Sequence, residues 1–183
     1  FELETDPRTG LEVPKFWRPG DDEETRFELD PETHEPTIFL MVASYRDFQC
    51  RETVASALAR AAVPERLRIN VVEQNAPEDD FACDVPEGRR TACGIGKDDD
   101  PHPLCRHKSR IRVFRGLTAE DATGPVYARH VGCRLYRGEA FAAQVDAHVQ
   151  FTQNWDTELI EQWRTLRNEM AVLSTYLTDV QNS

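Results

Sequence analysis

The sequence predicts an α/β domain built on a mostly parallel sheet. Short apolar runs of strand length alternate along the chain with longer amphipathic patterns of helical period. The expected order is strand, helix, strand, strand, helix, strand, helix, strand, which crossover helices between parallel strands would produce. The chain has 183 residues, 39% hydrophobic and 30% charged, so it is long enough for one domain with its own core.

The first half of this pattern opens with a near-continuous apolar run over 37–43, typical of a strand buried on both faces. A helix is expected over 49–63, because apolar side chains recur there at helical spacing and Pro64 stops the pattern. The second strand covers 67–72. Residues 75–108 then form a polar loop rich in Asp, Pro, Gly and Cys, and loops of this length are often functional.

Three strands and two helices are expected after this loop. Pro125 stands in the first turn of one helix, and Gly138 is expected to cap its end. The other helix carries an apolar stripe formed by Trp155, Leu159, Trp163 and Leu166. The expected ranges are 111–114, 140–145 and 171–174 for the strands, and 125–137 and 155–167 for the helices.

Charge and hydropathy argue against nucleic-acid binding and against a membrane span in this sequence. The net charge is −11, which argues against nucleic-acid binding because phosphate neutralisation needs a basic face. No stretch reaches the ~18 apolar residues of a membrane span. Residues 1–36 hold few aliphatic side chains and many Pro, Asp and Glu, so we expect an acidic extended N-terminal arm ahead of a domain over 37–183.

The five cysteines leave three interpretations open. Cys83, Cys93 and Cys105 share the polar loop, while Cys50 and Cys133 lie in predicted helices. A disulfide among the three loop cysteines comes first, free thiols second, and a zinc site that includes His102 and His107 third. A disulfide would indicate a secretory compartment.

The most informative motif is Gln144-Val145-Asp146-Ala147-His148, at the end of a predicted strand. Residues i and i+2 of an extended chain project to the same side. In open α/β sheets, ligands bind outside the carboxyl ends of the strands. A carboxylate oxygen and an imidazole nitrogen suit Mn²⁺ or a similar divalent ion, so Asp146 and His148 are candidate metal ligands.

Other polar side chains follow the predicted strands. Residues 44–47, Ser-Tyr-Arg-Asp, could stack a base and bind a ribose, or form a simple turn with Asp47 as a helix N-cap. Gln74 follows the second strand. Arg129 lies in the second turn of the helix that starts at Pro125, and a helix N-terminus with an arginine suits a diphosphate. No Gly-x-Gly-x-x-Gly fingerprint is present.

These motifs carry a family resemblance. In order along the chain, they are Ser44-Tyr45-Arg46-Asp47, Gly124-Pro125-Val126-Tyr127-Ala128-Arg129-His130 and Gln144-Val145-Asp146-Ala147-His148. Together they resemble the family of Skp1 hydroxyproline N-acetylglucosaminyltransferase-like glycosyltransferases, over about residues 37–177. Asp146 and His148 with the nearby Trp155 also resemble the metal motif of polypeptide GalNAc-transferases.

The resemblance implies a GT-A (Rossmann-like) nucleotide-sugar-binding fold, with 37–183 as its N-terminal part. It implies transfer of GlcNAc from UDP-GlcNAc, with retention, to a hydroxyl acceptor on a protein or glycan, and protein hydroxyproline is one candidate. Asp146 and His148 would hold Mn²⁺ against the diphosphate. Arg129 would lie near the donor phosphates or sugar, while Ser44, Arg46 and Gln74 would line the uridine pocket.

Two departures from the family pattern bear on activity. Ala147 stands where the family commonly has Ser, and its side chain should point away from the metal. The chain stops at Ser183, soon after an apolar run, so we expect a C-terminally truncated piece of a longer protein.

Two alternatives to an active transferase stay open. They are a non-catalytic or truncated domain acting as a binding module, and a metal-dependent hydrolase. The compartment stays open between the cytoplasm and the Golgi lumen.

Overall fold

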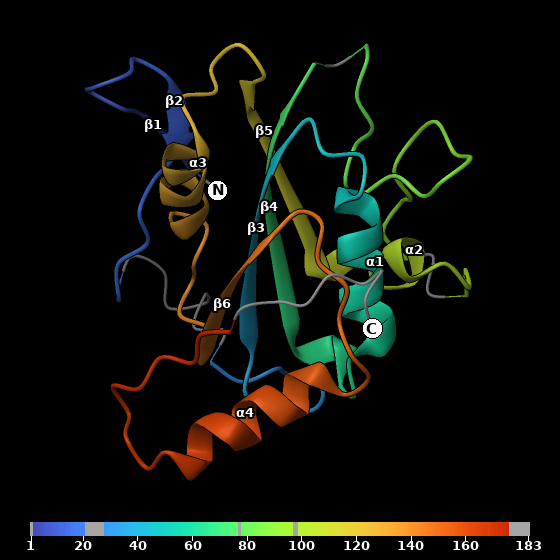
Figure 1. The fold of residues 1–183 in the computed structure, drawn as a ribbon, viewed down its shortest axis with the longest axis vertical. Coiled ribbons are helices and arrows are strands. Elements are labelled where there is room, and N and C mark those ends of the chain that lie inside the picture. Colours follow the sequence, from blue (N-terminus) through green and yellow to red (C-terminus); the bar gives the residue numbers. More distant parts are fainter. Residues whose placement is uncertain (1, 21–27, 77, 97–98, 176–183) are drawn as a thin grey trace.

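Four parallel strands form the central sheet of the computed structural model, which describes residues 2–20, 28–76, 78–96 and 99–175 (Figure 1). In spatial order the strands are β5 (Ile111–Thr118), β4 (Leu67–Asn75), β3 (Ile38–Tyr45) and β6 (Phe141–Asp146). All three pairings are parallel. The sheet and its helices form a Rossmann-like α/β fold, which confirms the predicted fold class.

Helices connect the parallel strands. Helix α1 (Cys50–Arg60) and the 3-10 turn Pro64–Arg66 link β3 to β4, and α3 (Pro125–Cys133) links β5 to β6. The polar loop between β4 and β5 holds the short helix α2 (Pro103–Arg106) and a 3-10 turn, Lys108–Arg110. Helix α4 (Trp155–Thr165) follows β6 and lies at the end of the sheet where the strands begin (Figure 1). Among the described residues, no helix is long and apolar enough to cross a membrane.

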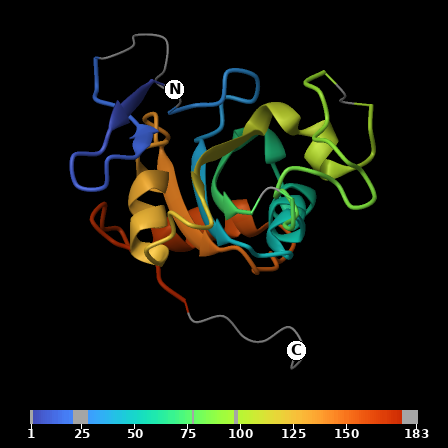
Figure 2. The same ribbon diagram turned by 90° about the horizontal axis from the view of Figure 1, so that it is seen from above.

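Both faces of the sheet are covered, which explains the unbroken apolar run in β3. Ile38, Leu40 and Val42 pack with residues of α1, α2 and α4 on one face. Phe39 and Met41 pack with α3 on the other face. Because successive strand side chains alternate between the faces, a strand covered twice needs apolar residues at every position. Figure 2 shows α1 and α3 on opposite sides of the strands.

Part of the acidic segment before Thr37 forms a hairpin against α3. Strands β1 (Leu3–Thr5) and β2 (Glu12–Pro14) are antiparallel. Tyr127 of α3 donates a hydrogen bond to the Asp6 carboxylate at 3.0 Å, and Arg134 bonds both Glu4 and the carbonyl oxygen of Pro14. Val13 is fully buried beside α3. The hairpin therefore covers the outer side of the helix that carries Arg129.

A second contact of this segment is a buried ion cluster at the beginning of β4 and β5. The Asp30 carboxylate is fully buried and accepts hydrogen bonds from Arg68 and Arg110, each at 2.9 Å. Burial alone would raise the pKa of Asp30, but bonds from the Thr33 and Glu32 backbone and from Arg68 outweigh it and lower the pKa to about 2. The segment around Asp30 is thereby fastened to the sheet.

Several sequence-based boundaries were wrong. Helix α3 ends at Cys133 rather than at 137, and Gly138, with φ of 91°, lies beyond its end. Helix α4 buries Trp155 and Ile160, while Leu159 and Leu166 of the predicted stripe are exposed. The physical reason is a tertiary contact: the Trp155 indole donates a hydrogen bond to the Ala57 carbonyl oxygen of α1 at 2.9 Å, so the Trp155 side of α4 faces α1.

The predicted fifth strand over 171–174 is absent from the part of the chain that the structure describes. These residues have no strand partner, and Val172 is 88% exposed. The Ala171 carbonyl oxygen instead accepts a hydrogen bond from the Trp163 indole at 2.9 Å, so the chain folds back on α4. A short apolar run does not form a strand unless a neighbouring edge offers backbone partners.

The cysteines form two disulfides, Cys50–Cys83 and Cys93–Cys105, and Cys133 is free. The second pair confirms a disulfide among the loop cysteines. The first pair was not predicted, because Cys50 was assigned to the apolar face of α1. The zinc interpretation was wrong, since both disulfides consume the thiolates that it needs.

Candidate functional site

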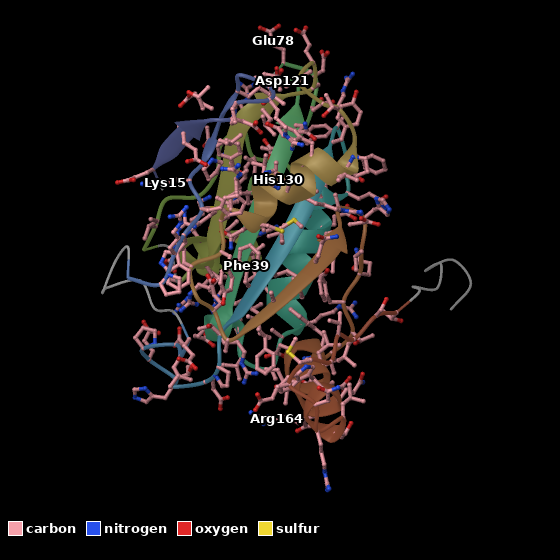
Figure 3. All side chains as sticks on the ribbon, turned by 90° about the vertical axis from the view of Figure 1, so that its left-hand side faces the viewer. Lys15, Phe39, Glu78, Asp121, His130 and Arg164 are labelled. Atoms are coloured by element: carbon pink, nitrogen blue, oxygen red, sulfur yellow. A yellow bond between two sulfur atoms is a disulfide. The ribbon has the colours of Figure 1, made fainter. Side chains whose placement is uncertain are left out.

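The predicted site residues gather at the carboxyl edge of the sheet. Register places Ala43 of β3 beside Asp146 of β6, and Tyr45 beside Gln74 of β4. The Arg46 backbone N–H donates to the Gln74 carbonyl oxygen at 3.3 Å. Figure 3 marks this edge by Glu78 and Asp121 and the opposite end of the molecule by Arg164 of α4. Parallel strands bring their carboxyl ends together, so residues far apart in sequence meet here.

Asp146 and Arg129 form an ion pair across the site. Asp146 is the last residue of β6, and its Oδ1 accepts from the Arg129 guanidinium at 2.7 Å. Both side chains are partly exposed, at 55% for Asp146 and 35% for Arg129. The neighbouring His130 packs instead on Phe16 and Tyr127, and burial lowers the pKa of its imidazole. Arg129 is thus the basic side chain that α3 directs to the strand edge.

His148 is held by Asp47, from the turn after β3. The distance from His148 Nδ1 to Asp47 Oδ2 is 2.9 Å, and Asp47 Oδ1 accepts from the Gln49 backbone N–H at 2.9 Å. Gln49, not Asp47, is the residue that precedes the first turn of α1. The extended geometry expected for the motif was wrong, because β6 ends at Asp146 and His148 lies in a turn. Ala147 is nevertheless buried between two exposed residues.

Thr53 clamps this turn from the buried face of α1, and sequence reasoning missed it. Its hydroxyl donates to the Ala147 carbonyl oxygen at 2.8 Å and accepts from the Val149 backbone N–H at 3.0 Å. The side chain is 1% exposed. The available signal was a hydroxyl residue within the apolar face of a predicted helix, where it needs a partner to offset burial.

Ser44 and Gln74 are buried where β3 and β4 end. Ser44 Oγ and Gln74 Nε2 have no hydrogen-bond partner among the described residues. Unsatisfied buried polar atoms are rare in folded proteins and often coincide with functional sites. Both atoms lie beside the edge that carries Asp146, and each would gain a partner if a polar ligand or a water entered the edge.

Arg46 binds the polar loop. It adopts a left-handed φ of 50°, and its Nε donates to Asp80 at 2.9 Å. The Ala76 backbone N–H also donates to Asp80, and this bond, together with Arg46, lowers the pKa of the Asp80 carboxyl. Asp80 was not predicted as a site residue, because an acidic run in a loop usually indicates a solvated surface.

An open hollow of about 200 Å³ lies next to this contact, at the carboxyl ends of β4 and β5. Its charged groups are already paired, because Glu73 accepts from Arg115 at 3.0 Å and Asp80 accepts from Arg46. A ligand in the hollow would therefore meet ion-paired side chains and the amide of Asn75 rather than an unpaired charge. Its lining residues are Glu73, Asn75, Asp80, Ala82, Arg115, Leu117 and Thr118.

The side chains at the carboxyl edge provide only part of the ligands that a metal ion needs. The described residues contain no group of three or more His, Cys, Asp or Glu side chains that could hold an ion. As candidate ligands, Asp146 and His148 would supply one oxygen and one nitrogen. Any ion at this position would therefore take its remaining ligands from water, a diphosphate or residues outside this set.

A family model described as "Glycosyltransferase (GlcNAc)" matches residues 37–182. The chain belongs to this GlcNAc glycosyltransferase family. The matched region contains every candidate site residue and leaves out the β1–β2 hairpin. No curated protein and no solved structure matches the chain at a significant level. The carboxyl edge of the sheet therefore lies within a GlcNAc glycosyltransferase domain. Such a domain implies a sugar donor and an acceptor.

Proposed function

We propose that the chain transfers GlcNAc from UDP-GlcNAc to a hydroxyl group of a protein or glycan acceptor, with retention and with help from a divalent cation, Mn²⁺ being the expected ion. The observation that carries this proposal is the placement of two pairs at the carboxyl edge inside the family match. Arg129 contacts Asp146 at the end of β6, and His148, two residues further on, is held by Asp47. Arg129 provides a cation for phosphate, and Asp146 and His148 would provide two ligands for a metal.

The metal would be held by Asp146 and His148. Asp47 engages Nδ1 of His148, which leaves Nε2 as the nitrogen for coordination. Asp146 would exchange its contact with Arg129 for the ion. When bound, the metal supplies a Lewis acid that stabilises the charge on the departing UDP.

Arg129 would then bind the donor phosphates. Its Nε is buried without a hydrogen-bond partner among the described residues, so the guanidinium has unused donor capacity. The first turn of α3, behind Gly124 and Pro125, presents backbone N–H groups near the same edge. Ser44, Arg46 and Gln74 would contact the uridine, for which the two unpartnered buried atoms are suited.

The finer features of this proposal are supported by the sequence resemblance alone. They are the GT-A type, membership of the Skp1 hydroxyproline subfamily and hydroxyproline as the acceptor. The two disulfides favour an oxidising compartment over the cytoplasm.

A second candidate is a non-catalytic binding module with the same fold. The observation that favours it is the small ligand set, because the described residues offer two metal ligands and one of them is ion-paired with Arg129. This candidate predicts nucleotide binding that does not depend on a metal, or no nucleotide binding.

Thermal shift with UDP, with and without Mn²⁺, tests the proposal. A ligand that binds only the folded state raises stability with the logarithm of its saturation. We expect stabilisation that needs both UDP and Mn²⁺ and is lost in the D146A/H148A double variant. The C133S variant serves as the control, because Cys133 is an exposed free thiol outside the site. Equal UDP affinity in the double variant and the parent would overturn the metal site.

A further inference from the structure

We infer that Asp47 and Thr53 are positioning residues that hold the His148 turn in the form that binds a metal. The inference rests on the proposed metal-dependent function. It concerns two side chains placed outside the proposed ligand set. Asp47 lies in the turn that joins β3 to α1, and Thr53 lies in the first turns of α1; together, 47–53 form one continuous segment. Three hydrogen bonds cross from this segment to the turn after β6.

Asp47 would set which nitrogen of His148 is available. An ionised carboxylate only accepts hydrogen bonds, so His148 Nδ1, 2.9 Å away, must carry the proton. The lone pair of the neutral imidazole then lies on Nε2, which points away from this contact. The carboxylate cannot rotate freely, because its other oxygen accepts from the Gln49 backbone N–H at 2.9 Å.

Thr53 would set the path of the backbone. Its single hydroxyl donates to the residue before His148 and accepts from the residue after it. The contact is fully buried, so water cannot replace it without a cavity. The clamp therefore keeps Ala147 inside and presents His148 at the surface, next to Asp146. Serine can make both hydrogen bonds, whereas valine, of similar shape, can make neither.

The segment that carries both side chains is itself anchored. Cys50, the first residue of α1, is bonded to Cys83, and the Cys83 backbone N–H donates to the Glu73 carboxylate of β4 at 2.8 Å. Asp47 and Thr53 lie on either side of this anchor. They are therefore attached to the sheet independently of the turn that they hold, as a positioning role requires.

The test measures Mn²⁺ binding in the presence of UDP, by calorimetry and by electron spin echo modulation from a histidine nitrogen on the ion. The variants of the 183-residue chain are D47N, T53V and T53S. Asp100 provides the matched control, D100N, because its carboxylate is 19% exposed like that of Asp47 and also pairs with one basic side chain at 2.9 Å. Circular dichroism checks that each variant is folded.

We expect D47N to weaken Mn²⁺ binding by roughly 10- to 100-fold, the usual effect of removing an outer carboxylate. T53V should weaken binding and reduce the nitrogen modulation, and T53S should restore both. If T53V does not fold, D47N alone decides the matter: binding as tight as in D100N then overturns the inference. The inference is overturned if the parent binds Mn²⁺ with UDP and both D47N and T53V bind it as tightly as D100N does. If the parent itself shows no metal-dependent UDP binding, the proposed function fails as well, so the two failures are distinguishable.

Discussion

The ion pair between Arg129 and Asp146 predicts that one substitution, R129Q, changes metal binding and nucleotide binding in opposite directions. In the structure, the guanidinium lies 2.7 Å from a carboxylate oxygen that the proposed metal needs. Arg129 thus supplies the positive charge that the ion would supply in the loaded site. Glutamine removes this charge and keeps most of the length and polarity of the side chain.

The magnitudes follow from exposure and charge. Both partners are partly exposed, at 35% and 55%, so the pair contributes roughly 0–1 kcal/mol. Mn²⁺ alone should therefore bind R129Q up to about fivefold more tightly than the parent. A hydrogen bond to a charged group contributes about 1.5–3 kcal/mol. UDP in saturating Mn²⁺ should bind R129Q roughly 10- to 150-fold more weakly, because Arg129 no longer reaches the phosphate.

Two titrations by calorimetry measure these effects, one with Mn²⁺ alone and one with UDP at saturating Mn²⁺. The R164Q variant is the control, since Arg164 lies on α4 at the opposite end of the molecule (Figure 3). Both of its affinities should equal those of the parent. Weaker binding of Mn²⁺ alone to R129Q, or unchanged affinity for UDP, would refute the assignment of Arg129 to the phosphates.

Three further predictions concern stability. Because the folded-state pKa of Asp30 is about 2 and its usual value is 3.8, its carboxylate stabilises the fold above about pH 4, and this contribution is lost as the pH falls toward 2. D30N should cost roughly 2 kcal/mol or more at neutral pH, because it also removes the buried carboxylate that Arg68 and Arg110 bond. It should also weaken the loss of stability between about pH 4 and 2, and an unchanged pH dependence in that range would contradict this. Replacing Cys50 and Cys83 by Ala opens a crosslink of 33 residues and should cost about 3–4 kcal/mol in denaturant unfolding, with C133S unchanged; equal midpoints would show that the crosslink contributes little. G132A places a methyl group 2.7 Å from Met41 between α3 and the sheet and should cost roughly 1–3 kcal/mol, whereas G94A, with open space around it, should be nearly neutral, and similar melting temperatures for both would argue against tight packing there.

The sequence alone determined the four strands of the sheet and the strand ends at which the candidate site lies. The run over 37–43 predicted a strand buried on both faces, and β3 occupies the interior of the sheet with covered faces. Polar residues directly after apolar runs marked the carboxyl ends of β3, β4 and β6. Local periodicity carries this information, because burial imposes a pattern on each strand and each helix separately.

The ends of the helices, the buried face of α4 and the existence of the fifth strand were less predictable from the sequence. The run over 171–174 had strand-like composition but no strand partner, and the stripe on α4 followed spacing rather than the contact between Trp155 and Ala57. Composition describes what a segment can bury. Neighbouring elements decide whether it is buried and on which side, so these errors fall where one contact outweighs the local pattern.

Only the tertiary structure decided how the site is held together. Asp47 and His148 are 101 residues apart, Thr53 and Ala147 are 94 apart, and the Cys50–Cys83 bond spans 33 residues. No local pattern encodes these contacts, because they depend on two strand ends lying side by side in the sheet. The residue types of the candidate site, a carboxylate, an imidazole and an arginine, were therefore readable from the sequence. The partners that orient them were fixed by the packing of α1 and α3 against opposite faces of the sheet.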